Sequence, residues 1–364
     1  MAINRDVFED LFVLEMANNH WGRIDRGMQI VSDYARVARY NNVRAAIKFQ
    51  LRDIETFIHP DHADRTDVRY IKKTMDTWMS REDFAKLAAH IRKSAFIPMA
   101  TPFDEASVDF CVELGIPILK LASSDLNDWV LIEKIATTKL PVIASTGGSS
   151  QKDIDDLVTF FANRDIPLAL NHCVSLYPSE DRDLELNQVD YLVNRYPDIT
   201  VGFSTHEHSN WEVSVAIAYA KGARTFERHV DIEADGMPVS PYCSLPEQVD
   251  TWFKAFNRAK AMCGGSGNSK RIPSQEEITY LDGLVRGVYA KTDLPAGHAL
   301  TDDDFFLAVP LLKGQLSCRE LFRGEPLAQP VAKNEPLTID HLDNPYSRYA
   351  HLGDLIRQRG IDPL

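Results

Sequence analysis

Short apolar runs alternate with amphipathic stretches over the first three quarters of the chain, and this alternation sets the expected fold. The apolar runs have the length and β-branched content of buried strands. The amphipathic stretches between them repeat apolar residues at helical spacing, as in 26–42, 81–95, 151–165 and 210–223. The expected strand segments are 11–20, 43–50, 96–104, 117–125, 141–149, 167–175, 200–207 and 223–230.

The number of strand–helix units decides between two arrangements of a parallel sheet. Eight units over about 260 residues favour a closed (β/α)8 barrel, the TIM barrel. An open doubly wound sheet is the competing arrangement, but the GxGxxG turn of a dinucleotide site does not follow the first strand. We therefore predict an α/β fold built on a TIM barrel.

The pattern changes after residue 230, where a proline-bearing loop and one long helix end the regular alternation. A polar, Gly/Ser-bearing stretch follows and has the composition of a linker. Beyond it, two similar segments, 290–305 and 328–342, indicate a small β-rich domain with an internal duplication. The predicted divisions are 1–265 for the barrel domain, 266–284 for the linker, 285–345 for the small domain and 346–364 for a tail.

Composition and charge narrow the classes of function. With 44% hydrophobic and 26% charged residues the chain has an ordinary globular composition, and no apolar run reaches the roughly 20 residues of a membrane helix. We recognise no secretory signal, and five cysteines without a CxxC pair fit a reducing, cytoplasmic setting and give no zinc signature. A net charge of −13 argues against nucleic acid or an anionic membrane as the main partner, but a cleft lined by lysines could still bind a small anion.

Polar residues end all eight predicted strands. In a TIM barrel these ends meet at one rim, where catalytic groups lie. A single polar strand end is expected wherever a chain surfaces, whereas eight such ends with lysines inside apolar runs indicate a site. The rim positions are Glu15, Asn19, His20, Lys48, Gln50, Thr101, Lys120, Ser123, Ser145, Thr146, His172, Ser175, Tyr177, Ser204, His206, Glu227 and His229.

Two lysines of the rim, Lys48 and Lys120, come from strands that can face one cavity from different sides. A lone interior lysine is more often an ion-pair partner, but two lysines ringed by hydroxyls suit a ligand with a phosphate and a carboxylate. The accompanying hydroxyls are those of Thr101, Ser123, Ser145 and Ser204.

Histidines and a carboxylate at the same rim suggest a divalent cation and proton transfer. His206 and His229 close adjacent strands, so neutral imidazoles could hold a metal with Glu15 or water, and either histidine could instead be structural. His206 with His208 is a rival pair, although His208 lies beyond the expected strand end. Burial raises the pKa of Glu15 and lysines lower it, which suits proton transfer, substrate orientation or a plain ion pair.

Eight segments together resemble the sialic acid synthase family, which makes N-acetylneuraminate and related nonulosonic acids. The segments are "EMANNHWG", "IKFQ", "ATPFD", "LKLASSD", "ASTGG", "HCVSLYPS", "VGFSTHE" and "FERHV", and the C-terminal unit resembles the antifreeze-like SAF domain of that family. The resemblance implies condensation of phosphoenolpyruvate with an open-chain sugar aldehyde, giving a 3-deoxy-2-ulosonic acid and phosphate.

The resemblance also implies roles for individual residues and a partner. His206 and His229 match metal ligands for Mn²⁺, with Mg²⁺ or Co²⁺ as alternatives, and Glu15 matches the catalytic glutamate. A domain-swapped homodimer is implied, in which the SAF domain caps the partner's barrel. The positions implied to bind phosphoenolpyruvate are Lys48, Thr101, Lys120, Ser123, Ser145 and Ser204, and those for the sugar are Gln50, Ser175, Tyr177 and Ser240.

Three positions depart from the family pattern, and all three are expected on the sugar side. Thr205 and Ser240 stand where aspartates are usual, and Val309 stands where the family has an arginine. We therefore expect an acceptor other than N-acetylmannosamine.

The stretch 59–83 should overhang the barrel mouth. Its Arg65, Arg69, Lys72 and Lys73 either meet a charged acceptor or form the solvated side of a lid or a dimer contact. Two other functions remain open: a metal-dependent sugar isomerase or aldolase, and a sugar-binding homologue without turnover.

Overall fold

The structure is a computed structural model that describes residues 6–265, 267–320, 323–343 and 350–363. It divides into two compact units, residues 1–264 and residues 265–364. Each unit has a hydrophobic core of its own. Within the described part of the chain, no helix has both the length and the apolar character needed to cross a membrane.

The first unit is the predicted TIM barrel. Eight parallel strands close in sequence order, so that β1 pairs with both β2 and β8. The strands are β1 Leu11–Ala17, β2 Arg44–Leu51, β3 Ile97–Pro102, β4 Ile118–Leu121, β5 Val142–Ser145, β6 Leu168–Cys173, β7 Thr200–Thr205 and β8 Thr225–His229.

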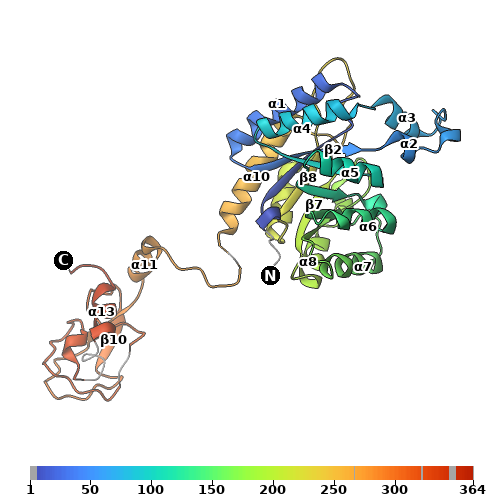
Figure 1. Cartoon of the computed structure of the whole chain (residues 1–364). Coiled ribbons are helices and arrows are strands. Elements are labelled where there is room, and N and C mark those ends of the chain that lie inside the picture. The colour runs from blue at the N-terminus through green and yellow to red at the C-terminus, as the bar shows by residue number, and fades with distance from the viewer. Residues whose placement is uncertain (1–5, 266, 321–322, 344–349, 364) are drawn as a thin grey trace. The chain divides into compact units, whose positions relative to one another are not determined.

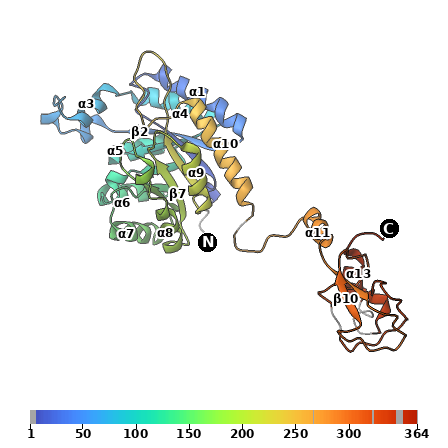
Figure 2. The same ribbon diagram turned by 180° about the vertical axis from the view of Figure 1, so that it is seen from behind.

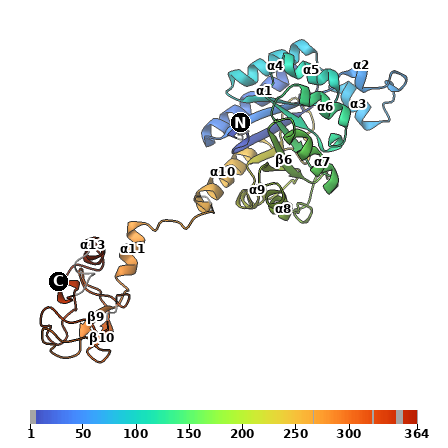
Figure 3. The ribbon, with the colours of Figure 1, turned by 60° about the horizontal axis from the view of Figure 1, so that its bottom comes forward.

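A ring of helices surrounds these strands, as Figures 1 and 3 show. Ser80 and Asp104 begin two of the helices by accepting a hydrogen bond from a backbone N–H of the first turn. The last helix of the ring, α10, contacts both α9 and α1 and so closes the circle (Figure 2). The ring consists of α1 Ile24–Asn41, α4 Arg81–Lys93, α5 Glu105–Glu113, α6 Trp129–Thr137, α7 Gln151–Ala162, α8 Asn187–Arg195, α9 Trp211–Ala220 and α10 Pro246–Cys263.

Short elements fill several of the connections. The longest connection, residues 52–80 between β2 and α4, is called the arm below. It projects beyond the end of β2 (Figure 1) and holds α2 Ile54–Phe57, a 3₁₀ turn at Pro60–His62 and α3 Arg69–Asp76. Further 3₁₀ turns are Asp6–Phe8, Ser123–Asp125 and Asp181–Asp183.

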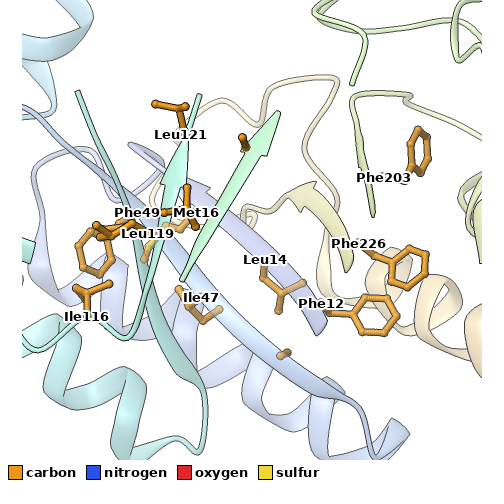
Figure 4. Packing of buried hydrophobic residues seen from close by; sticks show 14 of the residues in the cluster. Phe12, Leu14, Met16, Ile47, Phe49, Ile116, Leu119, Leu121, Phe203 and Phe226 are labelled. Carbon is orange, nitrogen blue, oxygen red and sulfur yellow. The ribbon is translucent and has the colours of Figure 1, made fainter. Parts of the chain in front are cut away.

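Alternation along each strand separates the outer core from the barrel interior. Phe12 and Leu14 of β1 point outward under the helices, and Phe12 lies 5.2 Å from Phe226 between ring centroids (Figure 4). Leu11 and Val13 point inward instead and share a second apolar cluster. On β1 to β6 that cluster occupies the inward positions before the polar residues, so the polar side chains gather toward the C-terminal ends. Its buried members are Phe8, Leu11, Val13, Ala46, Met99, Ile118, Ile143 and Ala169.

The second unit contains a small antiparallel sheet of β9 Gly287–Ala290 and β10 Phe305–Ala308. Its helical elements are α11 Gln275–Asp282, which lies inside the range predicted as a linker, the 3₁₀ turn Ile339–His341 and α13 Ala350–Gln358.

The two similar segments of this unit adopt matching local structures. Gly297 and Asn334 hold equivalent positions, and both have positive φ, +79° and +68°. Four residues further along, the backbone N–H of Thr301 donates to Asp304, and that of Thr338 donates to His341. The two segments also pair through a bridge between Leu294 and Val331, which supports the internal duplication expected from the sequence.

Candidate active site

Four buried charged side chains form the floor of the barrel mouth. Lys48 Nζ lies 2.5 Å from Glu15 Oε2 and 3.4 Å from Glu227 Oε1. Lys120 Nζ lies 4.0 Å from Glu227 Oε2. Strand register brings them together, because Glu15 of β1 pairs with Lys48 of β2 and with His229 of β8. The predicted lysines therefore lie together inside the barrel, and each has a glutamate beside it.

The pKa values of the four groups are shifted from their ordinary values, two upward and two downward. Burial lowers the pKa of Lys120, while for Lys48 the nearby Glu15 and Glu227 outweigh burial and raise the pKa. Burial would raise the pKa of Glu227, but Lys120 and Lys48 outweigh it and lower the value. Burial dominates at Glu15 and raises its pKa. Glu227 therefore stays ionised, and Glu15 is the carboxyl group that more readily takes up a proton.

Hydroxyl groups lie around both lysines, as predicted. Lys48 donates to Thr101 Oγ1 at 3.1 Å, and Lys120 donates to Ser145 Oγ at 2.6 Å. Each ammonium group therefore has a hydroxyl group beside it, and an ammonium–hydroxyl pair can donate to an anionic ligand.

A second group of hydroxyls gathers around Gly147 after β5. The backbone N–H of Gly147 donates to Ser123 Oγ at 3.1 Å. A Cβ at this position would lie 2.2 Å from Ser175 Oγ and 2.8 Å from Ser123 Oγ, so only glycine lets the two serines converge. We call Ser123, Gly147 and Ser175 the hydroxyl pocket. The structure thus places Ser175, a predicted sugar-binding residue, beside the predicted anion-binding residue Ser123.

Ser204 lies on β7 directly opposite Cys173 of β6. Burial raises the pKa of the Cys173 thiol, and the nearby Lys120 opposes this shift, so the thiol lies beside the floor of the mouth. Sequence reasoning did not select Cys173, although it follows Asn171 by two residues on β6 and therefore lies on the same side of the strand.

Beneath Ser204, packing inside the barrel requires a glycine. Thr225 donates to Asn171 Oδ1 at 2.5 Å across the face of Gly202. A Cβ at Gly202 would lie 1.8 Å from Thr225 Oγ1 and 2.3 Å from Asn171 Oδ1. This contact layer supports the residues of the mouth from below.

The two predicted metal ligands lie together at the rim. The ring centroids of His206 and His229 are 5.4 Å apart, whereas His208 is exposed. His206 Nδ1 donates to the carbonyl oxygen of Val174 at 2.9 Å, which leaves Nε2 with its lone pair. Burial lowers the pKa of His206 to about 4 and the pKa of His229 well below its ordinary value, so both rings are neutral near pH 7.

This donor set fits a divalent transition-metal ion as two of its ligands. A neutral imidazole held by a backbone carbonyl is the usual state of a metal-binding histidine. Among the described residues no group of three or more His, Cys, Asp or Glu side chains is placed to hold a metal. A metal bound at His206 and His229 would therefore need oxygen ligands from substrate or water.

Aromatic and amide side chains line the other side of the mouth. The Tyr177 ring lies 3.9 Å from His206, and the Tyr242 ring lies 5.1 Å from His229, between centroids. Tyr242 was not predicted; Ser240, which was, is hydrogen-bonded to it.

Gln50 connects the floor to the arm. Its Nε2 donates to Glu15 Oε1 at 2.9 Å, and its Oε1 accepts from Arg52 Nη1 at 3.0 Å. The predicted sugar-binding residue Gln50 therefore lies in contact with the predicted catalytic glutamate.

One of the three departures from the family pattern proves to lie outside the mouth. The Thr205 hydroxyl donates to Glu207, whose carboxylate pairs with Arg228 at 3.0 Å. Side chains alternate along β7, so Thr205 faces away from the cavity that Ser204 and His206 face. The expectation that Thr205 concerns the sugar side is therefore wrong. Val309 is exposed in the second unit.

Several other rim residues also have structural partners. Asn19 Nδ2 donates to the carbonyl oxygen of Val230 at 2.8 Å, and His172 Nε2 contacts that of Leu184 at 2.7 Å. His20 Nδ1 accepts from a backbone N–H at 3.1 Å. Glu227 is a rim residue for which the sequence predicted no role, and the structure shows it in contact with both lysines. The signal for it was its position two residues before His229.

One solved structure shares this architecture, and curated proteins have similar sequences. A structure named as a spore coat polysaccharide biosynthesis protein E from Chromobacterium violaceum is 36% identical, with a TM-score of 0.87, over 92% of this chain and 100% of that one. The N-acetylneuraminate-9-phosphate synthase of Drosophila melanogaster is 26% identical over 78% of this chain and 77% of its own length. The N,N'-diacetyllegionaminic acid synthase of Legionella pneumophila is 25% identical over 82% of this chain and 85% of its own length.

Two family descriptions match the chain in its two units. The SAF domain matches residues 285–343, as the resemblance of the C-terminal segments predicts. The NeuB family matches residues 38–267, more than half of the chain. The recognition made from eight short segments is therefore confirmed, and the chain belongs to the NeuB family.

Proposed function

We propose that this protein condenses phosphoenolpyruvate with an open-chain sugar aldehyde to give a 3-deoxy-2-ulosonic acid and phosphate. The observation that carries the proposal is the meeting of two buried lysines, their hydroxyl partners and two neutral histidines in one barrel mouth. The synthases among its relatives support the same class of reaction.

Phosphoenolpyruvate presents two anionic ends, and the mouth offers donors for both. Lys48 with Thr101 and Lys120 with Ser145 form two cation–hydroxyl pairs. The hydroxyl pocket and Ser204 add neutral donors beside Lys120. Charge-assisted hydrogen bonds of this kind are short and strong, which fits tight orientation of a small dianion or trianion.

In the proposed reaction, C3 of phosphoenolpyruvate bonds to the aldehyde carbon, and the aldehyde oxygen becomes a hydroxyl by taking up a proton. Water adds to C2, and loss of phosphate by C–O cleavage leaves the ketone of the product. Glu15 is suited to take up the proton that the attacking water loses, because burial raises its pKa and Gln50 fixes its carboxyl group.

His206 and His229 are the residues that would hold a divalent ion, with Mn²⁺ favoured and Mg²⁺ or Co²⁺ as alternatives. When bound, such an ion would act as a Lewis acid toward the aldehyde oxygen, where negative charge develops. The Tyr177 ring packs against the His206 ring at an interplanar angle of 40° and restricts its movement at the edge of the mouth.

The acceptor is proposed to differ from N-acetylmannosamine. Gln50, Tyr177 and Ser240 are among the residues proposed to contact the sugar, but Ser240 cannot supply the carboxylate usual at its position, and Val309 cannot supply the guanidinium. Charged hydrogen bonds are worth roughly 1.5–3 kcal/mol each, so the usual acceptor should bind weakly. Turnover of N-acetylmannosamine as efficiently as any other aldose would contradict this part of the proposal.

A homodimer in which the SAF unit of one copy caps the barrel of another completes the proposal. Its support is the match of residues 285–343 to the SAF domain. Light scattering on the full chain should give twice the monomer mass, and a monomer that is fully active would refute the swapped arrangement.

The decisive assay measures phosphate released from phosphoenolpyruvate across a panel of aldoses with Mn²⁺, Mg²⁺ or Co²⁺, and mass spectrometry identifies the product. We expect release that needs both an aldose and a metal. Lys120→Met should abolish it without unfolding the barrel, which thermal unfolding checks.

One observation favours a second candidate, a lyase that forms a Schiff base. Burial lowers the pKa of Lys120, as such a lysine requires. Borohydride trapping of a carbonyl substrate on Lys120 would favour the lyase over the condensation.

A further inference from the structure

The far end of the arm is fixed against the mouth of the barrel. Asn18 Nδ2, after β1, donates to Thr77 Oγ1 at 2.7 Å. The carbonyl oxygen of Trp78 approaches so closely that a Cβ at Gly22 would lie 2.7 Å from it. Helix α3, which ends one residue before Thr77, is therefore held next to the site.

Helix α3 and the turn before it carry four basic residues, of which two form ion pairs with aspartates and two do not. Arg65 pairs with Asp67 at 2.6 Å, and Lys72 pairs with Asp76 of its own helix. Arg69 and Lys73 lie one turn apart on α3, on the same face. Neither forms an ion pair with any carboxylate in the part of the chain that the structure describes.

Lys73 lies on the turn of α3 that is tied to the mouth, because its carbonyl oxygen accepts from the Thr77 hydroxyl at 2.7 Å and that hydroxyl accepts from Asn18. Lys73 is half-buried. The charges of Cys243, Arg52, Arg69 and Glu15 contribute to the shift of its pKa. Burial is the main reason that the pKa of Lys73 is lowered, and the two arginines lower it further.

Arg69 is exposed and lies one turn earlier on the same face of α3. Its charge acts on Tyr242, whose ring lies 5.1 Å from that of His229.

Arg52 is a third cation at this edge. It lies 3.8 Å above the centre of the Phe103 ring and donates to Gln50, and burial lowers its pKa to about 10. Asp104, one of the acids near it, already accepts from two backbone N–H groups while capping α5. Arg52 forms no ion pair with a described carboxylate.

We propose that Arg69, Lys73 and Arg52 bind an anionic group of the acceptor sugar, either a carboxylate or a phosphate ester. The inference rests on the proposed function and names the class of its second substrate. A partly buried ammonium without a counterion is unfavourable, and an anion at this position relieves that cost. Two guanidinium groups add the planar fork that carboxylates and phosphates share as a partner.

The alternative is that the basic residues only solvate the arm or contact another copy. That alternative gives all four residues the same role, whereas the structure pairs Arg65 and Lys72 with aspartates and gives Arg69 and Lys73 no carboxylate partner among the described residues. Lys72 and Arg65 therefore serve as matched controls on the same segment.

The test compares Lys73→Gln and Arg69→Gln with Lys72→Gln and Arg65→Gln in the full chain. Each variant is assayed for phosphate release with hexuronic acids, hexose 6-phosphates and the corresponding neutral aldoses. We expect the KM for an anionic acceptor to rise about tenfold or more in the first two variants, with the KM for phosphoenolpyruvate unchanged. The two controls should behave like the unmodified enzyme.

The outcomes separate the two levels of the proposal. Preference for uronic acids over 6-phosphates, or the reverse, identifies the anion and supports the inference. Equal turnover of neutral and anionic aldoses, with no effect of Lys73→Gln, overturns the inference and leaves the proposed function standing. Absence of phosphate release with every aldose, while calorimetry detects phosphoenolpyruvate binding, overturns the proposed function and the inference with it.

Discussion

Glu227 offers a quantitative test of the charge arrangement in the barrel mouth. It lies between the two lysines, 3.4 Å from Lys48 and 4.0 Å from Lys120, and it is buried. Glu227→Gln keeps the shape of the side chain and removes one negative charge. The variant should therefore be less stable without ligand and should bind phosphoenolpyruvate more tightly.

The magnitude follows from the distances. With an effective dielectric constant of about 20, two unit charges 4.0 Å apart attract by about 4 kcal/mol. Removing one partner of a buried ion pair typically costs about 3–5 kcal/mol, which corresponds to a fall of roughly 6–20 °C in Tm for a domain of this size. Lys48 keeps Glu15 as a partner, so the lower part of the range applies.

Phosphoenolpyruvate should restore the stability that Glu227→Gln loses, because the bound anion takes the place of the missing carboxylate. Like charges forced together cost several kcal/mol, so removing Glu227 should tighten phosphoenolpyruvate binding by about tenfold or more. Turnover is not expected to improve, because tighter binding of the ground state does not by itself lower the barrier.

Differential scanning calorimetry with and without phosphoenolpyruvate, together with titration calorimetry, measures both effects. Asp231→Asn is the matched control, because Asp231 pairs with Arg26 at 2.7 Å and is equally buried away from the lysines. It should lose stability without a change in affinity. An unchanged Tm for Glu227→Gln, or weaker binding of phosphoenolpyruvate, would refute the reasoning.

Three further substitutions test other parts of the site. Gly147→Ala places a Cβ 2.2 Å from Ser175 Oγ and should raise the KM for phosphoenolpyruvate about tenfold, measured by steady-state phosphate release. Gly202→Ala places a Cβ 1.8 Å from Thr225 Oγ1 and should lower the free energy of unfolding by about 2–4 kcal/mol in urea titrations. Glu15→Gln should lower kcat by about 100-fold or more and abolish the acid limb of the pH profile, whose midpoint should lie above the ordinary carboxyl pKa of 4.5 because burial raises it. Normal kinetics for Gly147→Ala, undiminished stability for Gly202→Ala, or an acid limb that persists in Glu15→Gln would each contradict the structure-based expectation.

The barrel was predictable because its information is local. Side chains repeat about every 2 residues in strands and every 3.6 residues in helices, and both repeats can be read from a short stretch of sequence. Helices α1, α4, α7 and α9 lie in the predicted stretches. The convergence of Lys48 and Lys120 was also predictable, since the barrel closes in sequence order and strand ends meet at one rim.

The parts that escaped prediction depend on contacts between distant segments. Glu227 contacts Lys48 and Lys120 only because the closed barrel brings distant strands together. The residues next to Glu227 in the sequence do not indicate these contacts. Thr205 was placed on the wrong side because its partner Glu207 is buried with Arg228.

The arm shows the same limit at the level of single side chains. Its short helix does not repeat an apolar pattern long enough to tell which lysine faces inward. Lys72 and Lys73 differ by one position and have opposite surroundings, one paired with Asp76 and the other beside Arg52.

The fate of the bridging oxygen of phosphoenolpyruvate tests the central claim most directly. With ¹⁸O at that position, a divalent metal and an aldose that the enzyme turns over, the account predicts that the label leaves with the released phosphate and that a water oxygen enters the product at C2. Label retained in the sugar product, or phosphate released at the same rate without any aldose, would contradict it.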